Sequence, residues 1–199
     1  MDLDAVEIRV LGCLIEKQRT TPDQYPLSLN SLRLAANQST NRDPVVDYDE
    51  GTIRAALDRL ANRGYTRLAS GPGSRAAKFR HLLDDALQLT PSQLALLAVL
   101  MLRGVQTAAE LRTRSERLYP FTSAADVEGT LGALSERGLV QRLPRRPGER
   151  EERWIHLLGG AGDEPDAPPP AAAAADDDRV ERLEREVAEL RARLDAAGL

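Results

Sequence analysis

The sequence contains one pattern twice, and this internal repeat limits the fold more than any other feature. An apolar helical stripe that ends at a glycine, Ile53, Leu57, Leu60 and Gly64, matches Val127, Leu131, Leu134 and Gly138 at an offset of 74 residues. The tripeptide at 81–83, His-Leu-Leu, recurs at 156–158, at an offset of 75 residues. Such a repeat is typical of tandem copies of one small unit. The chain of 199 residues has room for two of them.

Each copy shows three helical segments followed by two strands. In the first copy, apolar spacing predicts a helix over residues 3–17 and a second helix after the N-cap Ser28. We expect this second helix to turn Leu29, Leu32, Leu34 and Ala35 inward. A third helix follows the N-cap Asp49 and stops at Gly64. A strand over 65–69, a turn at 71–74 and a return strand over 79–83 complete the copy. This is the element order of a winged helix.

The second copy repeats this order and defines the predicted domains. Helices are expected from Thr90-Pro91, over 107–118 and over 124–137, and a hairpin is expected over 139–158. The sequence therefore predicts a mainly α fold with small β-hairpins, made of two tandem winged-helix domains and a C-terminal helix. Winged-helix domain 1 would span residues 1–84 and winged-helix domain 2 residues 85–158.

The C-terminal region differs in composition from the rest of the chain. Residues 159–175 are rich in Gly, Pro and Ala and are predicted to form a flexible linker. Residues 176–197 are predicted to form a heptad helix, with apolar positions at Val180, Leu183, Val187, Leu190 and Leu194. This apolar seam either pairs two chains or docks on the body of its own chain. We favour self-association and expect a homodimer.

The segment from Leu11 to Val45 joins an apolar helix, a turn with Thr21, Pro22, Asp23, Tyr25 and Pro26, and a polar loop. Here the chain resembles the YceH-like proteins, an uncharacterised bacterial family, and the resemblance extends more loosely to Leu158. It implies a pair of winged helices and implies no activity. Ala36 and Thr40 stand where relatives usually carry Cys and a residue such as Lys or Ser, which argues against a shared thiol chemistry.

Charge and composition exclude several classes of protein. Residues 1–83 carry 12 basic and 10 acidic side chains, residues 84–160 carry 10 of each, and residues 161–199 carry 5 and 11. The body is thus neutral to faintly basic, which permits nucleic-acid binding. No apolar run is long enough for a membrane span, and the acidic N-terminus is unlike a signal peptide, so we expect a cytoplasmic protein. Cys13 lies among apolar residues and is expected to be a buried hydrophobe.

The exposed face of the third helix of domain 1 is the candidate DNA-binding surface. Arginine suits this role because its planar fork can bind both phosphate and guanine. The chain, however, has 25 Arg and only two Lys, so arginine is also its ordinary surface residue, and Glu50 and Asp58 would repel phosphate. The candidate residues are Asn41 and Arg42 in the polar loop, Thr52, Arg54, Arg59 and Arg63 on the helix, and Arg75 and Lys78 in the wing.

The polar loop has a second interpretation, which we favour. Its Asn and Ser side chains would cap the second helix and satisfy backbone groups in a long turn. In domain 2, the third helix offers mainly small residues and acids, Glu128, Gly129, Gly132, Ala133 and Glu136. That surface would suit a protein partner more than DNA, although a solvated mixed-charge hairpin explains its wing equally well.

Catalysis finds no support in the sequence. The two histidines occupy equivalent ends of the two wings, which indicates a structural role, and no nucleophile–base pair, phosphate loop or metal motif is present. We expect no enzyme activity and no cofactor. The leading hypothesis is a dimeric DNA-binding protein with a regulatory role. The alternative is a protein-interaction adaptor that uses the same fold without contacting DNA.

Overall fold

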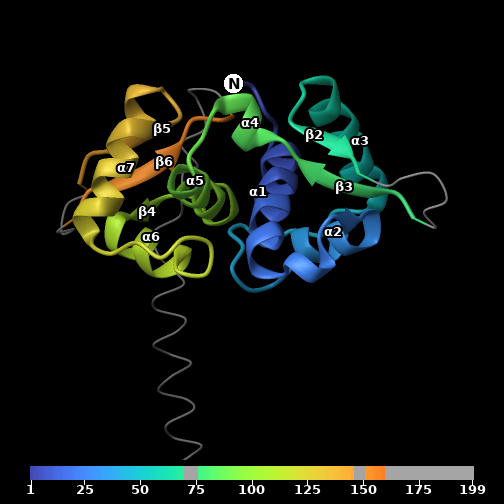
Figure 1. The fold of residues 1–199 in the computed structure, drawn as a ribbon, viewed down its shortest axis with the longest axis horizontal. Helices are drawn as coiled ribbons and strands as arrows, with labels where there is room; N and C mark the ends of the chain where they lie inside the picture. The colour runs from blue at the N-terminus through green and yellow to red at the C-terminus, as the bar shows by residue number, and fades with distance from the viewer. Residues whose placement is uncertain (70–75, 146–150, 160–199) are drawn as a thin grey trace, which may run out of the picture. The chain divides into compact units, whose positions relative to one another are not determined.

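The computed structural model describes residues 1–69, 76–145 and 151–159 (Figure 1). The chain is mainly helical with small antiparallel sheets, as the sequence predicts. The elements in chain order are α1 Ala5–Thr20, the 3₁₀ helix η1 Pro22–Gln24, β1 Leu27–Ser28, α2 Leu29–Ala36, α3 Glu50–Asn62, β2 Thr66–Leu68, β3 Lys78–His81, α4 Leu83–Leu87, α5 Pro91–Arg103, β4 Gln106–Thr107, α6 Ala108–Ser115, α7 Ala124–Glu136, β5 Val140–Leu143 and β6 Arg153–His156.

The described residues all belong to one compact unit. We refer to residues 1–84 as the first repeat and to residues 85–158 as the second repeat. Their assignment as separate domains stays a prediction. The predicted linker after Gly159 and the predicted C-terminal helix lie outside the described residues.

The two repeats have the same sheet topology, as the internal repeat in the sequence predicts. The strand order is β1-β3-β2 in the first repeat and β4-β6-β5 in the second, and all pairings are antiparallel. Figure 1 shows β2 beside β3 and β5 beside β6. In both repeats a two-residue strand before the second helix extends the hairpin to three strands. Sequence reasoning missed β1 and β4, because alternation of apolar and polar residues cannot be recognised over two positions.

Side-chain caps start the helices where the sequence predicts them. Ser28 Oγ accepts a hydrogen bond from Ser31 N–H, and Asp49 Oδ1 accepts one from Thr52 N–H. Thr90 forms a capping box with Gln93, directly before the proline at the first position of α5. At the other end of the third helices, Gly64 and Gly138 adopt φ angles of +76° and +66°, which only glycine adopts without strain.

Some local predictions differ from the structure. Leu34 was expected to point inward, but its side chain is 56% exposed. The second helix has only eight residues, and Leu32, Ala35 and Ala36 already fill its buried side. The turn that contains Pro22 includes a short helix, η1, which was not expected from the sequence. A five-residue helix, α4, spans the predicted boundary between the repeats.

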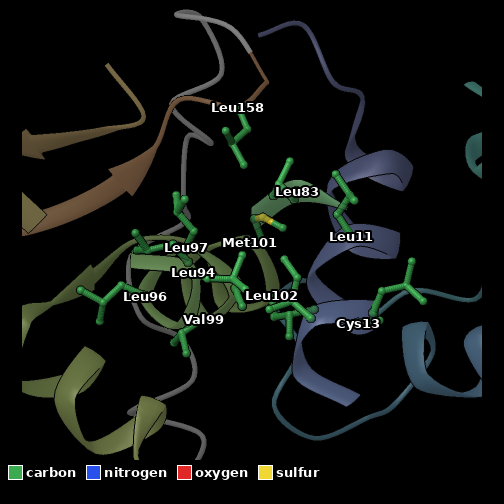
Figure 2. Packing of buried hydrophobic residues seen from close by; sticks show 14 of the residues in the cluster. Leu11, Cys13, Leu83, Leu94, Leu96, Leu97, Val99, Met101, Leu102 and Leu158 are labelled. Carbon is green, nitrogen blue, oxygen red and sulfur yellow. The ribbon is translucent and has the colours of Figure 1, made fainter. Parts of the chain in front are cut away.

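The core is organised around the first helix of each repeat. In α1 every residue from Arg9 to Ile15 is buried, and in α5 every residue from Leu94 to Leu102 is buried. Helices buried on all sides need neighbours on all sides. Accordingly α1 packs against α2, α3 and α5, and α5 packs against α1, α6 and α7. Figure 2 shows Leu11 of α1 with Met101 and Leu102 of α5 in this cluster.

The sulfur of Cys13 has the buried environment expected from the sequence. Cys13 is fully buried and reduced, and burial raises the pKa of its thiol to about 11. A thiol with such a pKa stays protonated at neutral pH, and thiolate chemistry is therefore suppressed.

The contact between α1 and α5 is closest at Gly12. A Cβ atom added to Gly12 would lie 2.9 Å from both Cγ and Cδ2 of Leu102 and 3.3 Å from Cβ of Met101. Leu102 is itself buried and has little room to move. The close approach of the two helices therefore requires glycine at this position.

Within the described ranges, no helix is long and apolar enough to cross a membrane.

Replacement of Gly12 by alanine tests this packing. Gly129 of α7 is the matched control, because it also lies inside a helix but a Cβ there would meet no atom within 4 Å. Alanine at position 129 should raise the free energy of unfolding by about 0.5–1 kcal/mol through helix propensity. Gly12→Ala should give the same propensity gain but overpack the core, at a cost of about 1–3 kcal/mol. Urea unfolding of both variants should therefore place Gly12→Ala at least about 1 kcal/mol below Gly129→Ala.

Candidate nucleic-acid interface

Helix α3 presents one buried face and one exposed face. Ile53, Ala56, Leu57 and Leu60 are buried against the core, as the apolar spacing predicts. Arg54, Asp58 and Arg63 lie among the exposed residues of the same helix and its C-cap. Thr52 takes part in the N-cap, because its backbone N–H donates to the Asp49 carboxylate. This bond and a hydrogen bond from the Thr52 side chain lower the pKa of that carboxylate. The face available for a ligand is thus short and mostly polar.

Two arginines of this face have no partner in the described part of the chain. Neither Arg54 nor Arg63 forms a side-chain hydrogen bond or an ion pair with any described residue. Arg59 differs from them. Its Nη2 donates to Asp4 Oδ2 at 2.5 Å, and its Nε donates to Glu7 Oε1 at 3.1 Å. Arg59 therefore ties α3 to the start of α1, and only Arg54 and Arg63 keep their full donor capacity.

The hairpin beside α3 contains a second basic group that sequence reasoning missed. Arg67 of β2 lies directly opposite Arg80 of β3. Like charges in directly opposed cross-strand positions are destabilising unless a counter-charge is near. Arg80 Nε is buried and has no hydrogen-bond acceptor in the described structure. Alternation alone could not have revealed this pair, because Arg67 and Arg80 oppose one another only in the observed register of the two strands.

The other two wing candidates have different outcomes. Lys78 is exposed at the start of β3, where it lies opposite Ser28 of β1. Arg75 lies outside the described residues, so its proposed contact stays a prediction.

The polar loop between α2 and α3 is held by two buried arginines. Arg42 has a fully buried side chain, and its Nη1 and Nη2 donate to Glu16 Oε1 and Oε2 at 3.1 and 2.7 Å. Arg42 also donates to the carbonyls of Ala35 and Asn41 and to Gln38 Oε1. Arg9 donates to the carbonyls of Ala36 and Pro44. These bonds satisfy the carbonyls at the end of α2.

The amides of the loop complete this internal network. The Asn37 side chain pairs with the backbone of Tyr48, donating to its carbonyl at 2.8 Å and accepting from its N–H at 2.9 Å. Asn41 adopts a left-handed conformation with φ +62°, and its carbonyl accepts from Arg42. The placement of Arg42 and Asn37 supports the structural interpretation of this loop. Asn41 is exposed at the loop surface.

In the second repeat, the basic groups at the end of α7 and on β5 are occupied. Arg137, at the end of α7, donates to the carbonyls of Leu87 and Gln88. Arg142 of β5 pairs with Glu128 at 3.3 Å and with Glu152 at 3.0 Å, and its guanidinium lies 4.8 Å from the centre of the Trp154 ring. The two repeats therefore share a topology but differ in how many arginines on these elements stay available.

The two histidines are structural, as their repetition indicates. His81 is buried, and its ring Nε2 lies 2.7 Å from Gln18 Oε1. The backbone N–H of His81 donates to the Tyr25 hydroxyl. Burial lowers the pKa of His81 to about 4, although Asp84 acts in the opposite direction. Burial also lowers the pKa of His156 to about 4. Both imidazoles are therefore neutral at pH 7.

The self-association residues Val180, Leu183, Val187, Leu190 and Leu194 lie outside the described residues.

These observations define a class: a mainly helical protein built from two equivalent units, with unpartnered arginines beside the first hairpin. Residues 3–149 match a family of proteins of unknown function, DUF480. The chain is 53% identical to a UPF0502 protein of Geotalea uraniireducens, over 96% of this chain and 91% of that relative. It is 47% identical to one of Citrobacter koseri, over 98% and 95% of the two chains. The chain therefore belongs to the DUF480 (UPF0502) family, which confirms the resemblance to the YceH-like proteins.

Replacement of Arg42 by alanine tests the structural role of the polar loop. The variant leaves Glu16 without its bidentate partner and several carbonyls without donors. Breaking a buried ion pair in this way should lower the free energy of unfolding by about 3–5 kcal/mol. Arg54→Ala is the control, since Arg54 is exposed, and should change stability by less than about 0.5 kcal/mol. Equal effects in urea unfolding would show that Arg42 does not organise the loop.

The buried histidines predict a loss of stability in acid. Between about pH 6.5 and 4 the unfolded chain binds a proton at His81 that the folded chain does not, so the free energy of unfolding falls as the pH falls. Each such histidine contributes a slope of up to about 1.4 kcal/mol per pH unit. His81→Gln should therefore flatten this dependence below pH 6.5 and leave it unchanged between pH 7 and 8. Parallel curves for the two proteins over the acid range would exclude a neutral buried His81.

Proposed function

We propose that this chain is a tandem winged-helix protein that binds duplex DNA through its first repeat. The three helices and three-stranded sheet of each repeat, in the order described above, support the winged-helix assignment. In winged-helix proteins that bind DNA, the third helix lies in the major groove and the hairpin contacts the backbone or minor groove. In the first repeat these elements are α3 and the β2–β3 hairpin.

The observation that carries this proposal is the distribution of unpartnered arginines. Arg54 and Arg63 on α3, and the opposed Arg67 and Arg80 on the hairpin, lack acidic partners in the described part of the protein. On α7 and β5 the corresponding basic groups, Arg137 and Arg142, are already bound within the protein. DNA phosphates would supply the anions that the first repeat lacks, with release of counterions from the DNA.

The proposed contact set therefore differs from the one expected from the sequence. Arg54, Arg63, Arg67, Arg80 and Lys78 would contact DNA. Arg59 and Arg42 would hold α3 and the preceding loop in position through their carboxylate partners. Asn41 lies at the exposed edge of that loop, and Thr52 donates to Asp49, the N-cap of α3. Asp58, also exposed on α3, would limit affinity and disfavour non-specific binding.

We further propose that the protein acts as a dimer with a regulatory role in the cytoplasm. The heptad seam in residues 176–197 would pair two chains, so that two first repeats could bind one DNA duplex. Two weakly basic surfaces joined in this way gain affinity because the second contact is intramolecular.

A protein-interaction adaptor is the second candidate function. A groove of about 370 Å³ runs between the N-terminus of α5 and α7, and Thr90, Gln93, Gly129 and Ala133 contribute to its lining. A Cβ at Gly129 or Gly132 would meet no atom within 4 Å, so this face of α7 is open. Small residues beside an open groove permit close approach of another protein. This adaptor function would need no contact with DNA.

Titration of random-sequence duplex DNA with the full-length protein at increasing salt tests the DNA proposal. The double variant Arg54→Gln/Arg63→Gln should bind about tenfold more weakly at low salt. Its plot of log affinity against log salt should be less steep by about two, because two phosphate contacts are lost. Fluorescence anisotropy with labelled DNA measures both quantities.

The matched control is Arg112→Gln/Arg145→Gln, which removes the same charge from exposed positions of the second repeat. It should leave the salt dependence unchanged. No binding of the wild type at low salt would contradict the proposal and favour the adaptor. Equal losses in the two double variants would show that net charge, and not the α3 face, drives binding.

A further inference from the structure

A polar cavity lies between the two repeats, on residues that the proposed DNA surface does not use. Its volume is about 300 Å³. The first repeat contributes Glu16 of α1 and Asn41 of the polar loop, and the second repeat contributes Arg103 of α5, Arg114 of α6 and Arg117 just after α6. Val99, Leu102 and Leu118 form apolar parts of its wall. Its volume is near the lower end of the range for small-molecule sites.

The acidic group deepest in this lining is already neutralised. Both carboxylate oxygens of Glu16 accept hydrogen bonds from Arg42, and Lys17 Nζ lies 3.1 Å from Glu16 Oε2. These two cations hold the pKa of Glu16 below its usual value despite burial, which acts in the opposite direction. Glu16 therefore stays ionised and paired, and it offers little attraction to a further cation.

The basic groups of the lining are only partly neutralised. Arg114 is occupied, since its Nη2 lies 3.0 Å from Glu110 Oε1 and its Nη1 donates to Gln106 Oε1 at 2.9 Å. Arg103 and Arg117 have no acceptor or ion-pair partner in the described ranges. Glu116, exposed at the rim, is the single lining acid without a described partner. Two uncompensated arginines thus face one uncompensated carboxylate.

Of these two arginines, Arg103 gives the stronger evidence that the cavity can hold an anion. It is half-buried at the last position of α5, where the helix dipole favours a cation. The dipole explains the charge at this position, but it supplies no acceptor for the five N–H donors of a guanidinium. Burial, together with repulsion from Arg114 and Arg42, lowers the pKa of Arg103, and attraction to Glu16 and Glu110 offsets this only in part. Arg103 thus has no direct anionic partner in the described structure while other guanidinium groups lie near it, and an anion beside it would stabilise its charged form.

We propose that this cavity binds a small organic anion, whose carboxylate or phosphate group is held by Arg103 and Arg117. A guanidinium binds either group through two parallel hydrogen bonds. The side-chain amide of Asn41 makes no hydrogen bond within the described structure and lies at the same cavity, where it adds a further donor. Val99, Leu102 and Leu118 contact the apolar part of the ligand.

The position of the cavity gives the ligand a structural consequence. The polar loop already meets α5 next to this site, because Asp43 N–H donates to the carbonyl of Leu102 at 2.9 Å. An anion held by Asn41 on one side and by Arg103 and Arg117 on the other adds a second link between the repeats. It therefore stabilises their packing, as expected for an effector site. This inference does not depend on DNA binding.

Isothermal titration of the full-length protein with inorganic phosphate and, separately, with benzoate tests the site and distinguishes the two anionic groups. At least one of them should bind with a Kd at or below about 1 mM, equivalent to about −4 kcal/mol. Arg103→Gln and Arg117→Gln should each weaken this binding about tenfold, as expected for loss of a charge-assisted hydrogen bond. Arg112→Gln, which removes the same charge from an exposed position of α6 outside the cavity, should bind like the wild type.

Two results would overturn the proposal. One is the absence of binding of either anion at concentrations of about 10 mM, roughly ten times the expected Kd. The other is an equal loss of affinity in Arg112→Gln and the two cavity variants, which would indicate a general charge effect. Arg117 is exposed, so Arg117→Gln should fold even if Arg103→Gln does not, and it carries the test alone in that case.

Discussion

The packing of α1 against α5 is the constraint on which the rest of the structure depends. Both helices are buried on nearly all sides, so neither repeat can cover its own first helix completely. Gly12 lets the two backbones approach until a single added methyl group would meet Leu102. The other helices and the two sheets are then arranged around this pair, and one apolar cluster runs through both repeats. Each repeat thus contributes half of a shared core.

A second, polar constraint acts beside this core. Arg42 and Arg9 are buried arginines that bind the loop between α2 and α3 from inside, and Glu16 of α1 supplies the counter-charge. A buried charge of this kind is tolerated only when its donors are satisfied, and here they are used on carbonyls that would otherwise lack partners. The loop that enters α3 is therefore fixed before any ligand binds. Arg42, a candidate for DNA contact in the sequence, thus holds the loop before α3 in place.

The surfaces of this protein differ less in net charge than in how many of their arginines are paired with acceptors within the protein. The described arginines of α7 and β5 are bound to carboxylates, carbonyls or the Trp154 ring. Other arginines retain donors without acceptors in the described structure: Arg54 and Arg63 at α3, Arg67 and Arg80 on the first hairpin, and Arg103 and Arg117 at the cavity between the repeats. The balance of basic and acidic residues is nearly even in both repeats, so composition alone could not distinguish these places. The two proposed binding surfaces would suit anions of different size, a duplex backbone at the hairpin and a small molecule in the cavity.

The sequence by itself determined the longer helices, the two hairpins and their order. Apolar spacing, the N-caps Ser28, Asp49 and Thr90, and the glycines Gly64 and Gly138 act over a few residues, so their signals can be read without knowledge of the fold. The repeat and the family resemblance likewise follow from the residues. The tertiary structure alone decided which arginines are available. The carboxylate partners of Arg42 and Arg59 lie 26 and 52–55 positions away in the chain. The opposition of Arg67 and Arg80 depends on strand register. Long-range pairing of this kind leaves no periodic trace in a single sequence, because it arises only when distant elements pack together.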